Sequence, residues 1–516
     1  MENGGLQLSM DRFDPGTIVK DVAFLEKAES LKPSLIHEFI EAEIDNPVFD
    51  HKNELTVDFK NHYVGYLSFC LEQASGKHQD SPVLLEISFF EHRKEFNENP
   101  KKYHGWISSS WIQTEQVFID HMPQEYRFER RHSFRYVRFR YLNGPKNISL
   151  RLTKAGIDSI SCADDKRLSV YEGNEEDRKM DAVGLRTLHE CMQVVFEDGP
   201  KRDQRLWLGD LRLQALANYV TYRQNDLVKR CLYLFAGSRY SSGLVSCNLF
   251  TEPYPEADDQ YMFDYSLFFI NVLWDYYKET GDRETLLELE PVARRQYEIL
   301  KDFFDQRHLI DPKKLTSCFV DWQKLLDKQT SAQGIFIYAA KALLEMETTL
   351  GKDGKDIAED ISLKTNAARE YLFDRKKGVF ISGRFRQVSY ASQIWMILAG
   401  VVSKQEGRDI LERIEKNSRA VGMVTPYMYH HYIQALIDCG EKEKAHKKMA
   451  LYWGAMIEDG ADTFYEIFDP SHPNASPYGG NIIHSFCHAW SCTPTYFLRK
   501  YYQNGSFQQQ IDTDPL

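Results

Sequence analysis

The hydrophobic pattern of this 516-residue chain changes its period once, and this change constrains the fold more than any other feature. From about residue 30 to 165, apolar and polar residues alternate in short stretches, such as those beginning at Tyr63, Val83, Phe134 and Ile148. Alternation rich in β-branched and aromatic residues predicts strands. Several such strands separated by turn signals predict an antiparallel β-sandwich.

From about residue 180 to 502, apolar residues recur with the period of a helix. The pattern predicts about a dozen helices, mostly in adjacent pairs. They are expected near residues 181–196, 209–222, 224–236, 262–280, 286–305, 331–349, 357–373, 388–402, 407–415, 426–438, 441–457 and 484–501.

An array of helix pairs of this size forms either an open solenoid or a closed double ring. A solenoid would repeat with a period of ~20–50 residues and recurring signature positions, and we find no such repeat. The loops are also uneven, and they contain the unusual residues: 198–210, 238–264, 316–322 and 459–483. We therefore expect a closed helical barrel with long loops at one end.

These patterns predict four parts of the chain. Residues 1–30 form an N-terminal extension and residues 31–170 the β-sandwich domain. Residues 171–502 form the helical barrel, which we expect to be the catalytic domain, and residues 503–516 form a loose polar tail.

The charge balance narrows the classes of partner. With 64 basic and 76 acidic side chains, the chain has a net charge of −12, which argues against a nucleic-acid or anionic-membrane partner. Nine dispersed cysteines and the absence of a signal-peptide pattern predict a cytoplasmic protein with reduced thiols. No apolar run approaches the length of a membrane span. A homodimer is left open.

The run from Asp198 to Asp210 holds three carboxylates, several cations and a tryptophan within thirteen residues. Gly199 and Pro200 predict a turn, and a helical pattern follows from Leu211. The charged run therefore lies on a loop that leads into a helix. The flat face of Trp207 suits the apolar side of a sugar, and carboxylates accept hydrogen bonds from sugar hydroxyls. We expect a small carbohydrate or glycoside as the partner.

Hydrolysis of a glycosidic bond needs one carboxylic acid to protonate the leaving oxygen and a second carboxylate to act as nucleophile or to activate water. Asp203 and Glu466 are the candidate pair. Asp203 lies between Arg202 and Arg205, so a structural ion pair is an alternative role. Glu466 has only aromatic and aliphatic neighbours in the sequence, and it could equally be a packed helix-end residue.

Other residues have competing explanations. Asp210 could cap the helix that follows it. His484 and His488 are four residues apart, on one face of a predicted helix, but they do not form the His-Glu-x-x-His pattern. We expect no metal there, and one histidine as the partner of a sugar hydroxyl. No nucleophile elbow, P-loop or dinucleotide fingerprint is present, so no cofactor is expected.

Four motifs, in order, resemble those of glycoside hydrolase family 78, the α-L-rhamnosidases. The run Asp198–Asp210 resembles the family's Asp-Cys-Pro-x-Arg-x-Glu-Arg-x-Gly-Trp-Thr-Gly-Asp. Residues 460–466 are similar to Gly-Ala-Thr-Thr-x-Trp-Glu, and residues 485–488 to Ser-Leu-Asn-His. Asp321-Trp322 resembles the family's Gly-Asp-Trp. The resemblance spans roughly residues 35 to 502.

The resemblance implies an (α/α)6 barrel preceded by β-sandwich modules, with inversion at the anomeric carbon. Inversion places the two carboxyl groups about 6.5–9.5 Å apart with a water between them. By position, Asp203 corresponds to the family's acid and Glu466 to its general base. The implied sugar-binding residues are Asp198, Arg202, Trp207, Asp210, Trp322 and His488, together with Asp264.

The chain departs from the family's pattern in several respects. Its acid is an aspartate, one methylene shorter than the usual glutamate, and the loop before it is one residue shorter. Phe464 and Tyr465 replace the family's tryptophan before the base. Only one β domain precedes the barrel, and the usual C-terminal β-sandwich is missing.

The function expected from these observations is inverting hydrolysis of terminal α-L-rhamnosides, or glycosides of a related deoxy or uronic sugar. One alternative is another enzyme on the same barrel, such as an unsaturated uronyl hydrolase, a lyase or a phosphorylase. A non-catalytic carbohydrate-binding protein is the other.

Overall fold

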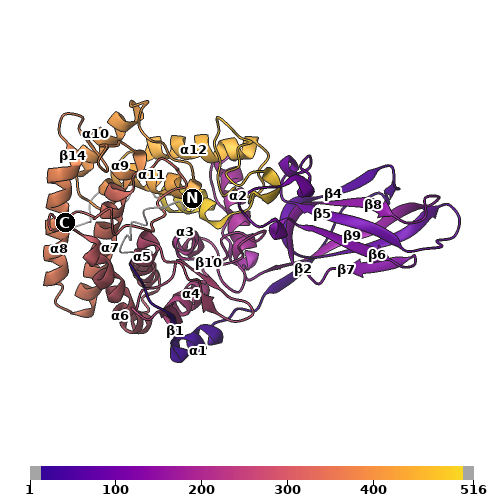
Figure 1. Cartoon of the computed structure of the whole chain (residues 1–516), viewed down its shortest axis with the longest axis horizontal. Helices are drawn as coiled ribbons and strands as arrows, with labels where there is room; N and C mark the ends of the chain where they lie inside the picture. The colour runs from indigo at the N-terminus through magenta and orange to yellow at the C-terminus, as the bar shows by residue number, and fades with distance from the viewer. Residues whose placement is uncertain (1–12, 504–516) are drawn as a thin grey trace, which may run out of the picture. The chain divides into compact units, whose positions relative to one another are not determined.

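The computed structural model of the chain describes residues 13–503, and these form two compact units (Figure 1). The first unit contains residues up to 32, 206–216 and 225–449. The second contains 33–205, 217–224 and 450 onward. Residues 504–516 of the expected tail, and residues 1–12 of the expected N-terminal extension, lie outside the described residues.

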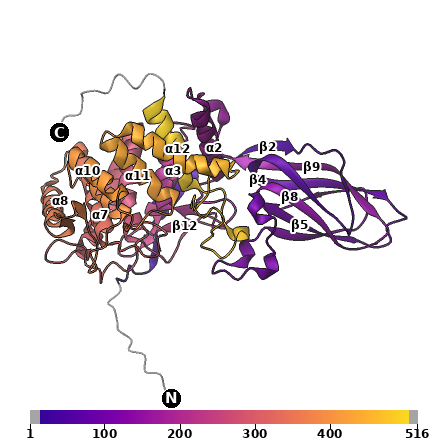
Figure 2. The ribbon, with the colours of Figure 1, turned by 90° about the horizontal axis from the view of Figure 1, so that it is seen from above.

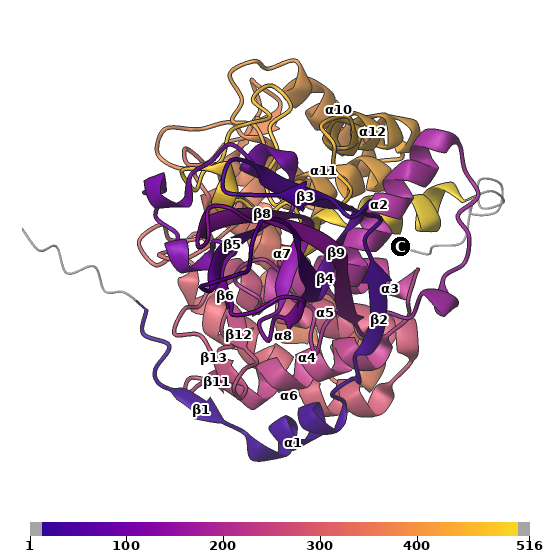
Figure 3. The same cartoon turned by 90° about the vertical axis from the view of Figure 1, so that its right-hand side faces the viewer.

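The second unit contains an eight-stranded sheet in which every neighbouring pair is antiparallel. The strands follow the order β2-β9-β4-β8-β5-β6, with β3 paired to β9 and β7 to β4. Figures 2 and 3 show the long strands side by side. Their bounds are β2 (Ile36–Glu41), β3 (Val48–Phe49), β4 (Glu54–Ser75), β5 (Val83–Phe90), β6 (Thr114–Ile119), β7 (Gln124–Arg127), β8 (His132–Asn143) and β9 (Ser149–Ser161).

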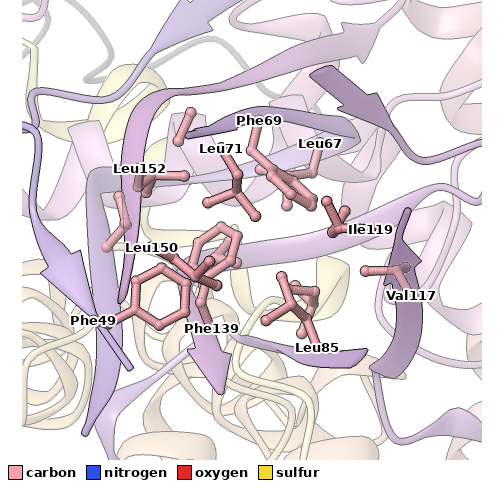
Figure 4. Close-up of a cluster of buried hydrophobic side chains, with 14 of the residues drawn as sticks. Phe49, Leu67, Phe69, Leu71, Leu85, Val117, Ile119, Phe139, Leu150 and Leu152 are labelled. Carbon is pink, nitrogen blue, oxygen red and sulfur yellow. The ribbon is translucent and has the colours of Figure 1, made fainter. Parts of the chain in front are cut away.

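The long strand β4 changes partners along its length. Its first part pairs with β8, the register shifts between Asp58 and Tyr63, and from Gly65 onward it pairs with β9. Buried side chains from the strands of this sheet form one hydrophobic core. Side chains from its strands point toward one another in that core, including Phe69 and Phe139, whose ring centroids are 5.2 Å apart (Figure 4). The predicted antiparallel β-sandwich is confirmed.

The same unit carries short helices beyond the sheet. Three 3-10 turns, η1 (Arg93–Glu95), η2 (Pro100–Lys102) and η3 (Ser109–Trp111), lie between β5 and β6, and η4 (Asp165–Arg167) follows β9. Helix α2 (Glu175–Cys191) then leads into the Asp198–Asp210 run. Asn174 caps α2 by accepting a hydrogen bond from the backbone N–H of Asp177.

Helices dominate the first unit. Helices α5, α7, α9 and α11 contact one another in succession, and α6, α8 and α10 pack beside them, which is the arrangement of helix pairs that the periodicity predicts. The bounds are α1 (Val22–Ser30), α4 (Asn225–Gly237), α5 (Phe263–Thr280), α6 (Arg283–Leu300), α7 (Gln329–Leu350), α8 (Lys355–Ala367), α9 (Tyr390–Leu398), α10 (Lys404–Glu415) and α11 (Pro426–Asp438). Helices α3 (Leu208–Tyr219) and α12 (Lys442–Glu458) have residues in both units.

The burial patterns separate two kinds of helix. Helix α10 buries one stripe, made of Gly407, Ile410, Leu411 and Ile414, and exposes the rest, as an amphipathic surface helix does. Helix α7 buries most of its residues on all sides. The first unit also contains the three-stranded sheet β10 (Leu206–Trp207), β12 (Asn248–Phe250) and β13 (Glu256–Ala257), and β1 (Ile18–Lys20) paired with β11 (Ser238–Tyr240).

The predicted helix over 484–501 is wrong in its first part, because helical structure begins only at α13 (Pro494–Phe497) and continues into the π-helix η9 (Leu498–Tyr502). The residues before α13 contain only the short 3-10 turns η7 (Asn481–Ile483) and η8 (Ala489–Ser491). His484 and His488 have extended backbones, so they do not share a helix face. The N–H of His488 donates to the carbonyl of Phe464, and that of Phe486 to the carboxylate of Glu91. Distant partners thus satisfy the groups that a helix would have paired locally.

The sandwich core provides a test of the fold. We expect Phe139→Ala to lower the free energy of unfolding by about 3–5 kcal/mol, because it removes a fully buried ring and leaves a cavity. Phe118→Ala, at a position that is 62% exposed on β6, should change it by less than about 1 kcal/mol. Urea unfolding followed by fluorescence measures both. Equal losses in the two variants would contradict the assignment of the core.

Candidate active site

The predicted site residues fall into two groups, one in each unit. The second unit contains both candidate catalytic carboxylates and three of the implied sugar-binding residues: Asp198, Arg202, Asp203, Glu466 and His488. The first unit contains the remaining four: Trp207, Asp210, Asp264 and Trp322.

The guanidinium of Arg202 lies at the centre of the first of these groups. One terminal nitrogen donates to Oε2 of Glu466, and Nε donates to the backbone carbonyl of Ile483 at 2.9 Å. Its other terminal nitrogen is 3.9 Å from Oδ1 of Asp203. Arg202 is only 4% exposed. This one buried cation therefore faces both candidate catalytic carboxylates.

Glu466 is buried and held on all sides. The hydroxyl of Tyr478 donates to its Oε1, and the Tyr478 ring lies 4.3 Å from the Arg202 guanidinium. Its backbone N–H donates to Ser485 at 3.1 Å, and its carbonyl accepts from the indole of Trp490 at 2.9 Å. Burial raises the pKa of Glu466, while the Arg202 charge and the Tyr478 hydroxyl oppose part of this rise.

Asp203 is at the tip of the turn that Gly199 and Pro200 begin. Its backbone is left-handed, with φ of 63°, and so is that of Gln204, with φ of 51°. Non-glycine residues rarely adopt this conformation, which persists only where surrounding contacts hold it. The side chain of Asp203 is 23% exposed, so it is accessible where Glu466 is not.

Asp198 and His488 hold the base of the same turn. Oδ1 of Asp198 accepts from the N–H of Arg205 at 3.0 Å, and its backbone carbonyl accepts from Ala489 at 2.7 Å. Nε2 of His488 is 3.9 Å from Oδ2 of Asp198. Burial and the Arg202 charge hold the pKa of His488 well below its usual range. The imidazole is therefore neutral, and its contact with Asp198 is not an ion pair.

In the first unit, Trp207 and Asp210 lie beside buried tyrosines. Trp207 is on the short strand β10, and its ring meets that of Tyr265 edge-on at 6.2 Å. Asp210 is buried within the first turn of α3, not at the cap position. Burial raises the pKa of Tyr265 well above its usual value, and the charge of Asp210 adds to the rise. Tyr265 therefore remains a neutral hydroxyl.

The carboxylate of Asp264 already has partners within the protein. Its oxygens accept hydrogen bonds from the N–H groups of Phe319, at 2.9 and 3.1 Å, and Val320, at 2.8 Å. Val320 has a left-handed backbone, with φ of 56°, so these bonds hold a strained turn. The observed contacts give Asp264 a structural role. Trp322, on the same loop, is 38% exposed and contacts the ring of Phe319.

The sequence did not identify two residues that complete these groups. Tyr478 lies in the loop after Glu466, and Tyr265 follows Asp264 within α5. Neither is in a motif, and a tyrosine is as common in a core as in a site. Their proximity to Glu466 and to Trp207 becomes evident only in the structure.

The second-unit group combines one buried carboxylate with one accessible carboxylate. Such a pair can take a proton from a water molecule and give a proton to a leaving group. Within residues 13–503, no group of three or more His, Cys, Asp or Glu side chains is arranged to hold a metal ion. None of the helices described is both long and apolar enough to span a membrane.

Two family models match the chain. One, described as the glycosyl hydrolase family 78 α-rhamnosidase N-terminal domain, covers residues 18–159. The other, the bacterial α-L-rhamnosidase six-hairpin glycosidase domain, covers residues 178–502. A search of curated proteins found no match.

Solved structures extend the comparison. A rhamnosidase from Klebsiella oxytoca with rhamnose bound is 40% identical, with a TM-score of 0.89, over 94% of this chain and 99% of that one. A family 78 rhamnosidase from Bacillus sp. GL1 shares the fold at 20% identity and a TM-score of 0.74. The match covers 91% of this chain but only 47% of that longer protein.

These matches confirm the fold expected from the sequence, a β-sandwich domain followed by a six-hairpin helical domain. They also confirm the class of protein that the four motifs indicate. The chain belongs to the α-L-rhamnosidases of glycoside hydrolase family 78.

Proposed function

We propose that the enzyme releases terminal α-L-rhamnose from small glycosides with inversion, using Asp203 as general acid and Glu466 as general base. The observation that carries this proposal is the placement of both carboxylates around the buried Arg202 guanidinium. The Klebsiella oxytoca rhamnosidase, similar along nearly the whole of both chains, is described with rhamnose bound and supports rhamnose as the sugar.

The proposed reaction is a single displacement. The carboxyl group of Asp203 gives its proton to the glycosidic oxygen as the bond from that oxygen to C1 breaks. On the opposite face of the sugar, Glu466 takes a proton from water as the water oxygen bonds to C1. The products are the free sugar and the alcohol of the leaving group. Proton exchange with solvent then restores both carboxyl groups.

The group around Glu466 suits the role of a base. A carboxylate oxygen has more than one lone pair, so each oxygen can accept a hydrogen bond from Arg202 or Tyr478 and still accept one from water. These donors also fix the orientation of the carboxylate before substrate binds. Preorganisation of this kind reduces the reorganisation needed in the transition state.

A panel of nitrophenyl glycosides tests the substrate and the stereochemistry. We expect release of nitrophenol from the α-L-rhamnoside and much slower release from uronic acid and hexose glycosides. Proton NMR should show β-L-rhamnose as the first sugar formed. Release of the α-anomer first would exclude inversion. An unsaturated product that absorbs in the ultraviolet, or turnover only with phosphate present, would indicate a lyase or a phosphorylase.

Substitution of the two carboxylates should separate their roles. Asp203→Asn and Glu466→Gln should each lower kcat/KM for a nitrophenyl α-L-rhamnoside by about 10²–10⁴-fold. With a dinitrophenyl leaving group, which needs no proton, the loss should be much smaller for Asp203→Asn and unchanged for Glu466→Gln. Glu172→Gln, at an exposed position, serves as the control and should retain full activity. Full activity in either active-site variant would exclude its assigned role.

Tyr478→Phe should move the acidic limb of the pH profile of kcat/KM to higher pH. The base works only when ionised, so activity is lost as the pH falls through its pKa. Removal of the hydroxyl removes a hydrogen bond that favours ionised Glu466, so the pKa rises further and activity is lost at a higher pH.

The matched control for this pH profile is Tyr103→Phe. The hydroxyl of Tyr103 donates to the backbone carbonyl of Tyr478 at 2.9 Å, and the structure gives it no hydrogen bond to Glu466. The acidic limb of the Tyr103→Phe pH profile should coincide with that of the wild-type enzyme. A Tyr478→Phe limb that is unshifted, or shifted to lower pH, would contradict the role given to this hydroxyl.

A further inference from the structure

The turn that carries Asp203 needs support because its backbone is strained. Asp203 and Gln204 both have left-handed backbones. On the C-terminal side the turn is closed by hydrogen bonds from Gln204 to the carbonyl of Gly199, at 3.3 Å, and from Arg205 to the carboxylate of Asp198, at 3.0 Å. Strained conformations persist only where surrounding contacts hold them. On the N-terminal side the contacts come from Arg202 and Lys201.

Lys201 anchors that side of the turn, two residues before Asp203. Its ammonium is 2.6 Å from Oε2 of Glu95 and 3.0 Å from the backbone carbonyl of His484. The side chains of Lys201 and Glu95 are each only 1% exposed. A lysine is rarely buried to this extent unless it is paired, so Lys201 depends on Glu95 for its position.

Glu95 is itself rigidly placed in the segment between β5 and β6. It ends η1, and its other carboxylate oxygen accepts from the N–H groups of Glu91, at 2.8 Å, and His92, at 3.0 Å. Burial raises the pKa of Glu95 to about 7, and the Lys201 charge opposes this rise. Without the lysine the pKa of Glu95 would be higher still, and the carboxyl would be protonated at neutral pH.

A second carboxylate of this segment supports the other side of the site. Oε2 of Glu91 accepts from the N–H of Phe486 at 2.7 Å. The carbonyl of the preceding residue, Ser485, accepts from the N–H of Glu466 at 3.1 Å. The segment between β5 and β6 thus contacts the chain that carries each candidate catalytic residue.

A buried ion pair is weak evidence for stability, because its desolvation offsets much of its attraction. Its geometry, in contrast, is specific: the ammonium holds two acceptors at defined positions. The Lys201–Glu95 pair is therefore better explained by the positions that it fixes in the turn than by a contribution to the stability of the fold. Lys201 occupies the unspecified position between proline and arginine in the family 78 signature, so the signature itself assigns it no role.

We propose that Glu95, acting through Lys201, is a positioning residue for Asp203, so that the segment between β5 and β6 takes part in proton donation to the leaving group. This inference rests on the proposed function of Asp203 as the acid. Neither Glu95 nor Lys201 is proposed to touch the substrate.

The dependence of rate on the leaving group tests this proposal. Misplacement of an acid slows only those substrates that need its proton. Lys201→Met and Glu95→Gln should lower kcat for methyl α-L-rhamnoside by about 10–100-fold. With the dinitrophenyl α-L-rhamnoside the loss should be less than about threefold, and KM should change little. The double variant should resemble the single variants, because both act through one contact.

Two further variants control for damage to the fold. Lys94→Met breaks the ion pair of Lys94 with Asp459, which is partly buried and also involves the segment between β5 and β6 but not the turn at Asp203. Its loss of rate should not depend on the leaving group. Lys201→Arg keeps the charge and should restore part of the activity on the methyl glycoside. If the Lys201→Met variant does not fold, the same test is made with Glu95→Asp, in which the carboxylate is only drawn back from Lys201.

The possible results distinguish a failure of the positioning role from a failure of the proposed function. Equal losses with both leaving groups, or no loss with either, would overturn the positioning role while leaving the proposed function intact. A wild-type enzyme that hydrolyses neither rhamnoside would overturn the proposed function, and this inference with it.

Discussion

The ion pair between Arg202 and Glu466 is the interaction on which the second-unit site depends. Both groups are buried, so each would be costly to desolvate alone, and removal of one partner of such a pair costs about 3–5 kcal/mol. The remaining faces of the guanidinium are also used, by the carbonyl of Ile483 and the ring of Tyr478. Because Asp203 is the next residue in the chain, the contacts that fix Arg202 also restrict the position of Asp203, the proposed acid.

This arrangement balances two opposing effects on Glu466. Burial alone would keep the carboxyl protonated and useless as a base, whereas a fully solvated ion pair would make it a weak base. Burial together with two donors leaves its pKa raised but restrained. The neighbouring histidines do not add charge to this balance, since burial keeps the pKa values of His484 and His488 well below their usual range. Arg202 is therefore the main positive charge that acts on Glu466.

The parts of the fold that the sequence predicted are those determined by local periodicity. The alternation of a strand and the repeat of a helix reflect which neighbouring side chains are buried. These patterns predicted the sandwich and most of the helices. Local periodicity failed for the segment containing His484 and His488, because the backbone groups of this segment form hydrogen bonds with Glu91 and other residues distant in the sequence. The same limit applies to the site: the motifs pointed to Asp203 and Glu466 as candidates, but the contact of Lys201 with Glu95 joins residues 106 positions apart, and no local pattern records it.

The short side chain of Asp203, the proposed acid, makes the contact between Lys201 and Glu95 more important. A glutamate can correct an error in its backbone position by turning three side-chain bonds, whereas an aspartate has two and a shorter reach. An error in the position of the Asp203 turn is therefore passed almost directly to its carboxyl group. The strained backbone at Asp203 and Gln204 already narrows the conformations that the turn can adopt. A buried anchor two residues upstream, held by Glu95, removes much of the freedom that remains. In the proposed role of Asp203 as the acid, an aspartate at this position places a greater demand on the supports of the turn than a glutamate would, and the Lys201–Glu95 contact is the support that we propose to meet that demand.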